Sequence, residues 1–215
     1  MKDRLTKVKF IFIVTLMIIY GCRGQTNDYD RCYKYLNKAR KSFNELLLGK
    51  ENKEIKVDSL ISATDIAIEC PATRMAAVEL KCSILIRWKK YKEGYEFVES
   101  LKQEDFKLPY KKQLYWNYFH AYECEANIDT IGRNRYLNSI IKNVSRYILE
   151  KNTHSNEIDK EAYYDLFFIK SRVLSSQEFD GQLNILMKKF PNDKEFLEAL
   201  KSTFYSRNNV TIMAQ

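Results

Sequence analysis

The sequence predicts an all-α protein. The whole chain of 215 residues holds only six glycines and three prolines, so turns are few and the regular elements are long. Apolar residues recur at three- and four-residue spacing, which is the period of a helix that buries one face. No Asn-Gly or Asp-Gly pair separates two alternating segments, as it would in a β-hairpin.

Helix breakers and caps divide the chain into nine expected helices. In chain order these cover residues 28–48, 54–70, 72–88, 91–103, 108–127, 131–150, 157–175, 178–190 and 193–206. The expected boundaries rest on breakers at or near the helix ends: Gly49, Pro71, Pro109, Gly132, Gly181 and Pro191. In the first helix the apolar residues that recur at three- and four-residue spacing are Tyr29, Cys32, Tyr33, Leu36, Ala39, Phe43, Leu46 and Leu47. Asp193 is placed to cap the last helix.

Paired helices with short connections recur about every 34 to 45 residues, which is typical of helical repeats. Within residues 76–101, Tyr91 follows the turn, and Gly94 and Cys82 take the small positions where helices approach. This stretch resembles a tetratricopeptide repeat. The resemblance implies a right-handed solenoid of about four helical hairpins plus a terminal helix. An irregular bundle is the alternative, and it differs by bringing the first and last helices together.

The N-terminal segment predicts export and lipidation. Four cations precede an uncharged apolar run over residues 10–20, which has the length of a signal peptide rather than a transmembrane helix. The motif Ile19-Tyr20-Gly21-Cys22 resembles the lipobox of bacterial lipoproteins. The resemblance implies diacylglycerol on Cys22 and an outer-membrane anchor, with the body facing the periplasm. An ordinary cleaved signal or a short membrane anchor is the alternative.

These observations set the expected organisation of the chain. Residues 1–21 are a signal peptide, 22–28 a lipidated tether, 29–206 one helical domain and 207–215 a tail. Removing the signal, which carries a net +3, lowers the formal charge from +8 to +5. The lysine doublets at 89–90, 111–112 and 188–189 are expected on solvated helix faces. We therefore expect no nucleic-acid partner.

The cysteines are judged by an oxidising compartment, because Cys22 is expected in the cell envelope. Four others remain: Cys32, Cys70, Cys82 and Cys124. Cys32 and Cys70 lie at equal distances on either side of the turn near residue 51, so they are expected at the same height of a hairpin. A disulfide between these two is the hypothesis, and buried free thiols are the alternative.

Candidate chemistry is sparse. His120 and Cys124 lie four residues apart on one helix, a spacing that offers two metal ligands or a thiol with a base. No second pair of this kind completes a site, so we interpret both as ordinary helix residues. His154 falls in a polar connection. No catalytic or phosphate-binding motif occurs, and the prediction is a protein that is not an enzyme and holds no cofactor or metal.

Aromatic residues crowd the fifth and seventh helices, which would line the concave face of a solenoid. The tyrosines proposed for partner contacts are Tyr115, Tyr118, Tyr122, Tyr163 and Tyr164, because aromatic rings add contact area at small entropy cost. Filling of the helix–helix core is the alternative for such residues.

The sequence therefore favours a lipid-anchored, non-catalytic helical-repeat protein that binds a protein or peptide in the bacterial cell envelope. Two other hypotheses stay open. The first is an immunity lipoprotein that neutralises a delivered toxin. The second is a cell-wall or glycan hydrolase, which would need converging carboxylates in a deep cleft.

Overall fold

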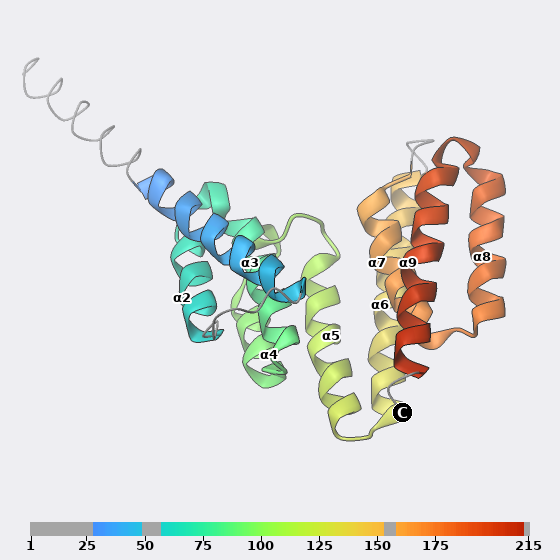
Figure 1. The fold of residues 1–215 in the computed structure, drawn as a ribbon, viewed down its shortest axis with the longest axis horizontal. Coiled ribbons are helices and arrows are strands. Elements are labelled where there is room, and N and C mark those ends of the chain that lie inside the picture. Colours follow the sequence, from blue (N-terminus) through green and yellow to red (C-terminus); the bar gives the residue numbers. More distant parts are fainter. Residues whose placement is uncertain (1–27, 49–56, 153–157, 213–215) are drawn as a thin grey trace, which may run out of the picture. The chain divides into compact units, whose positions relative to one another are not determined.

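The computed structural model describes residues 28–48, 57–152 and 158–212 (Figure 1). These residues contain nine α-helices and no strand. The first covers residues 28–47. The others are α2 (Val57–Ile68), α3 (Pro71–Arg87), α4 (Tyr91–Ser100), α5 (Lys111–Ala126), α6 (Thr130–Asn152), α7 (Lys160–Val173), α8 (Ser176–Lys189) and α9 (Lys194–Ile212). Short 3₁₀ turns at Gln103–Asp105 and Pro191–Asp193 precede α5 and α9. The all-α prediction is confirmed.

The helix ends follow local chemistry. Pro71 opens α3 at its first turn, where a missing N–H costs nothing. Asp159 caps α7 by accepting a hydrogen bond from the Ala162 N–H. Ser175 and Glu178 form a reciprocal capping box at the start of α8. These caps lie within two or three residues of the boundaries that the sequence predicts.

The last helix differs from the expectation of a C-terminal tail over residues 207–215. α9 continues to Ile212, through most of that stretch. Neither glycine nor proline follows Lys194, so the backbone meets no residue that breaks a helix.

The chain divides into two compact units. The first comprises residues up to Trp88 together with Glu104–Lys107, and the second comprises Lys89–Gln103 and the residues from Leu108 onward. The border falls inside the stretch that resembles a tetratricopeptide repeat, so α3 and α4 belong to different units. Each unit is therefore described separately, in place of the single domain expected over residues 29–206.

The first unit is a small assembly of three helices. Leu36 from the helix over residues 28–47 is buried against Ala67 of α2 and Ala77 of α3. The small alanine side chains let these helices approach closely. At the edge of the unit, the Nε atom of Arg74 donates to the carboxylate of Asp105 at 2.5 Å.

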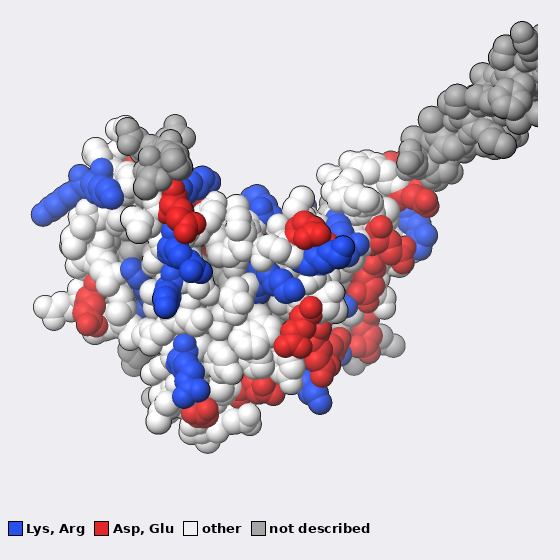
Figure 2. Space-filling model, turned by 180° about the vertical axis from the view of Figure 1, so that it is seen from behind, with Lys and Arg blue, Asp and Glu red and all other residues white. Residues whose placement is uncertain are grey.

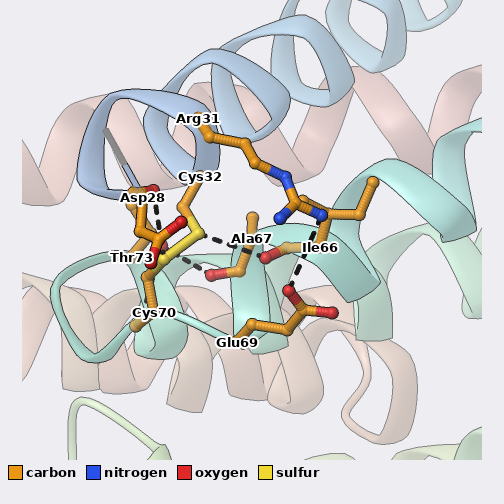
Figure 3. The surroundings of a disulfide bond; sticks show 8 residues. All are labelled: Asp28, Arg31, Cys32, Ile66, Ala67, Glu69, Cys70 and Thr73. Atoms are coloured by element: carbon orange, nitrogen blue, oxygen red, sulfur yellow. Dashed lines mark hydrogen bonds and ion pairs between the residues drawn. A yellow bond between two sulfur atoms is a disulfide. The ribbon is translucent and has the colours of Figure 1, made fainter. Parts of the chain in front are cut away.

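A disulfide joins Cys32 to Cys70 in this unit (Figure 3). Their Cα atoms are 6.2 Å apart, a normal separation for a disulfide. Beside the bridge, Arg31 and Glu69 form an exposed ion pair at 3.9 Å. The bonded cysteines are the two that lie at equal distances from the turn, the pair named by the sequence hypothesis. Cys82 and Cys124 are free thiols.

In the second unit each helix packs mainly on its neighbours in the chain. α4 packs on α5, α5 on α6, α6 on α7, and both α8 and α9 contact α7 and each other (Figure 1). α5 and α7 run in the same direction, because Lys111 pairs with Asp165 near their first turns while Glu125 pairs with Arg172 near their last. Phe119 of α5 and Phe167 of α7 are fully buried within this unit.

Gly94 is required by the contact between α4 and α5. A Cβ atom at Gly94 would lie 2.1–2.4 Å from ring atoms of Phe119, well inside van der Waals contact. The sequence correctly predicts that two helices approach at Gly94. The helix that approaches is α5, which follows α4 in the chain.

Replacing Gly94 with alanine is expected to destabilise the second unit by about 1–3 kcal/mol, even though alanine favours a helix by about 1 kcal/mol relative to glycine. Phe119 has no space to withdraw because it is fully buried. Urea denaturation measures the change. Gly181→Ala in α8 is the matched control, because a Cβ there meets nothing within 4 Å, and it should stabilise slightly. Equal effects of the two substitutions would contradict the steric explanation.

Candidate binding surface

The five tyrosines predicted to contact a partner divide into three classes. Tyr118 and Tyr163 are buried, with 7% and 4% of their surface exposed. Tyr115 and Tyr122 are half-buried, and Tyr164 is 39% exposed. The expectation of an exposed role is therefore corrected for Tyr118 and Tyr163, which fill the space between helices. Tyr115, Tyr122 and Tyr164 keep accessible surface.

Six aromatic rings form a continuous series across the second unit, which we call the aromatic row. In spatial order it consists of Tyr91, Tyr122, Tyr118, Phe168, Phe204 and Tyr164. Successive ring centroids lie 5.7, 5.7, 6.0, 5.9 and 5.7 Å apart, within the range of favourable aromatic contacts. The row crosses α4, α5, α7 and α9. Its end members Tyr91 and Tyr164 are accessible, whereas Tyr118 and Phe204 are buried.

Arg172 adds a charge to the aromatic row. Its guanidinium carbon lies 4.6 Å from the centroid of the Tyr122 ring, which is a favourable cation–π distance. The same guanidinium donates to the carboxylate of Glu125 at 2.5 Å. Packing and pairing therefore hold Arg172 in one orientation. Its role is not visible in the sequence, because Glu125 lies 47 residues away along the chain.

A buried polar network fixes α5 against α7 below the aromatic row. The Nζ atom of Lys111 lies 2.7 Å from Asp165 and 3.1 Å from Glu161, and the Tyr110 hydroxyl donates to Asp165 at 2.7 Å. Lys111 is only 5% exposed. The expectation that the 111–112 doublet is solvated is therefore wrong for Lys111, because helix α7 covers it with two carboxylates.

Burial and pairing act in opposite directions on this network. Burial raises the pKa of the Asp165 carboxyl, while Lys111 and the Tyr110 hydroxyl act to lower it. Burial and then Asp165 raise the pKa of Tyr110 well above its ordinary value. Tyr110 is therefore a permanent hydrogen-bond donor at physiological pH.

His120 lies inside a second aromatic group rather than at an open site. Its ring stacks on Tyr95 and Tyr136 with centroids 4.5 and 5.0 Å away, and Trp116 meets it edge-on at 4.2 Å. Its Nε2 atom is buried and has no hydrogen-bond partner. Burial lowers the pKa of His120, although Glu123 and Glu99 oppose the effect. The neutral ring therefore acts as a packing element.

Acidification is expected to destabilise the second unit through His120. Because the folded-state pKa lies below the ordinary value of 6.5, the unfolded state takes up the proton first as the pH falls. The stability contributed by the neutral ring is complete above pH 6.5 and is lost as the pH falls toward the folded-state pKa. Urea denaturation at pH 7.5 and 5.5 should show that the free energy of unfolding falls less between these two pH values for His120→Gln than for the natural chain. An equal loss would contradict the assignment.

The free cysteines are not activated nucleophiles. Burial, and then the nearby Asp129, raise the pKa of Cys124, so the reactive thiolate is disfavoured. Burial raises the pKa of the fully buried Cys82 thiol further. Among the described residues no group of three or more His, Cys, Asp or Glu side chains is arranged to hold a metal ion.

The predicted signal and the lipidation site Cys22 lie outside the described residues. Within the described part of the chain, no helix has the length and apolar character needed to cross a membrane. On the face shown in Figure 2, both basic and acidic side chains are present, and several acidic side chains lie close together on the right of the view.

Comparison with known proteins gives no family for this chain. No family model, curated protein or solved structure matches it.

Proposed function

We propose that this chain is a lipid-anchored, non-catalytic protein of the bacterial cell envelope that binds a protein or peptide partner on the aromatic row. Lipid on Cys22 would hold it to the outer membrane with its helical body in the periplasm. The aromatic row with Arg172 is the observation that carries the binding role.

The chemistry of the row suits protein recognition. Tyrosine and arginine are enriched among residues that dominate binding energy, because each adds contact area and a polar group. Contacts with neighbouring rings, stacked at Tyr122 and tilted at Tyr164, hold both side chains in place before any partner arrives. Binding then costs little additional side-chain entropy. The pairing of Arg172 with Glu125 likewise fixes a charge at the row.

The order of packing in the second unit supports a solenoid of hairpins. α5 and α7 are parallel, and α9 follows α7 in the same direction: Lys160 approaches Asp193 at one end, and Phe168 approaches Phe204 further along. In the proposed arrangement α5, α7 and α9 form an inner layer, and α4, α6 and α8 form an outer layer. The aromatic row then follows the inner layer, where a solenoid offers its extended binding surface.

Site-specific crosslinking in intact cells tests this proposal. A photoreactive phenylalanine analogue replaces Tyr122 or Tyr164, and the exposed Ile131 of α6 provides the control position. Both row positions should crosslink to the same protein, and Ile131 should not. The partner is then purified and its affinity is measured.

Removing the row side chains should weaken that affinity. Tyr122→Ala and Arg172→Ala should each raise the Kd about tenfold or more, as expected for residues at the centre of an interface. Cys22→Ser should release the protein from the membrane fraction. Equal crosslinking from Ile131, or unchanged affinity in both alanine variants, would count against the aromatic row as the binding surface.

A further inference from the structure

A small apolar pocket lies between α6, α7 and α8, lined by other side chains than those of the aromatic row. Its volume is about 230 Å³. Apolar side chains from three helices form most of the lining: Ile148, Leu166, Phe167, Ile185 and Leu186. Ile185 at the rim is 66% exposed, so the apolar lining continues to the protein surface.

One cation belongs to this apolar lining. The half-buried Lys170 donates from Nζ to the Gln182 amide oxygen at 2.5 Å, and Nζ lies 5.2 Å from the centroid of the Phe167 ring. No carboxylate among the described residues pairs with Lys170. Burial lowers the pKa of this amine, which shows that the surroundings disfavour its charge.

The half-buried Lys170 differs in its partners from Lys111, the buried lysine of the same unit. Lys111 is compensated by Glu161 and Asp165, whereas Lys170 has one neutral amide and an aromatic face. A desolvated charge without a counter-ion costs free energy. An anion that also covers the apolar lining would remove that cost and bury hydrocarbon surface in the same event.

We propose that this pocket binds a monocarboxylate with a short unbranched hydrocarbon chain, a medium-chain fatty acid. The carboxylate would pair with Lys170 and accept from the Gln182 amide, and the chain would cover Leu166 and Phe167. The volume of about 230 Å³ corresponds to roughly eight water molecules at about 30 Å³ each, and an eight-carbon chain can continue beyond it over the exposed Ile185 at the rim. That size suits one short chain and is below the usual 300–1,000 Å³ of sites for larger ligands.

The proposed site is independent of partner binding at the aromatic row. The fatty-acid site in the pocket would remain valid if no partner bound the aromatic row. The aromatic row would keep its proposed role if the pocket bound no fatty acid. The two experiments use different probes and different residues, so their outcomes are separable.

Photolabelling of the full-length protein in membranes tests the proposal. An octanoate analogue with a diazirine at the chain end should label residues of α6 or α8 that line the pocket, as mapped by mass spectrometry. Unmodified octanoate should compete at least about tenfold better than octanamide, because a charge-assisted bond is stronger than a neutral one. This comparison uses the natural chain and does not depend on the folding of a variant.

Lys170→Met separates charge from hydrocarbon contact. It keeps most of the side-chain length, and octanoate should lose its advantage over octanamide in this variant. Lys188→Met is the matched control, since Lys188 is an exposed lysine of α8. In this variant octanoate should keep the same advantage over octanamide as in the natural chain. Equal competition by octanoate and octanamide in the natural chain overturns the proposal. Labelling away from the pocket, or displacement only by acidic apolar peptides, also overturns it.

Discussion

Replacing Lys111 with methionine is expected to lower the free energy of unfolding of the second unit by about 3–5 kcal/mol. The substitution removes the cation that compensates Asp165 at 2.7 Å and Glu161 at 3.1 Å. Asp165 has only 16% of its side chain exposed, so water cannot replace the lost partner. The Tyr110 hydroxyl would remain as one donor to the carboxylate, which is too little to compensate a full charge.

The measurement uses the fact that the chain has two tryptophans. Trp88 belongs to the first unit and Trp116 to the second, so a Trp88→Phe background leaves a fluorescence probe in the second unit. Urea denaturation of this background with and without Lys111→Met gives the loss in free energy of unfolding.

A double substitution distinguishes loss of the ion pair from a general packing defect. Lys111→Met combined with Asp165→Asn should recover part of the stability, because the more buried of the two carboxylates left without their cation has gone and only Glu161 remains charged. The exposed Lys188→Met should change stability by less than about 0.5 kcal/mol. Strictly additive losses in the double variant would contradict the electrostatic explanation.

Loss of the Cys32–Cys70 disulfide is expected to destabilise the first unit by about 3–4 kcal/mol. The bridge closes a segment of 38 residues, and in the chain-entropy account a loop of this length restricts the unfolded state by that amount. The effect is large for this unit because the unit has few residues: its described part covers residues 28–48, 57–88 and 104–107. A small core supplies little hydrophobic stabilisation of its own.

Cys32→Ser, Cys70→Ser and the double variant should therefore lose the same stability, since each removes the same bond. A Trp116→Phe background leaves Trp88 to report on the first unit during denaturation, and Cys124→Ser in the second unit is the control. Alkylation of the unfolded protein checks the bond itself. Without reductant only Cys82 and Cys124 should react among the four cysteines after Cys22, and with reductant all four. Four modified cysteines in unreduced protein would exclude the disulfide.

Local sequence was sufficient to predict the helices but not to predict which of their side chains are buried. Residue spacing predicted every helix of the described residues, because helix formation depends on neighbouring side chains and caps. Two glycines expected to break helices, Gly132 and Gly181, instead lie inside α6 and α8. Which aromatic residues of α5 are buried and which stay accessible could not be predicted in the same way. Phe119 is fully buried while Tyr122 stays accessible, and the difference arises from Gly94 on α4 and Arg172 on α7.

Charged residues show the same limit. Lys111 and Lys188 both stand in lysine doublets, yet only Lys111 is buried, because two carboxylates of α7 lie against it. Lys170 carries no sequence signal at all, and its position in an apolar pocket follows from the packing of α8 on α7.

The sequence by itself predicted that this protein is helical and approximately where its helices lie, and it supplied the hypothesis that Cys32 and Cys70 face each other. Each of these depends on short-range periodicity or on simple counting from a turn. Only the tertiary structure decided which rings form a surface, which lysine is compensated and which is not. Those properties depend on residues that are tens of positions apart in the chain, such as Glu125 and Arg172, and their contacts exist only after the helices have packed.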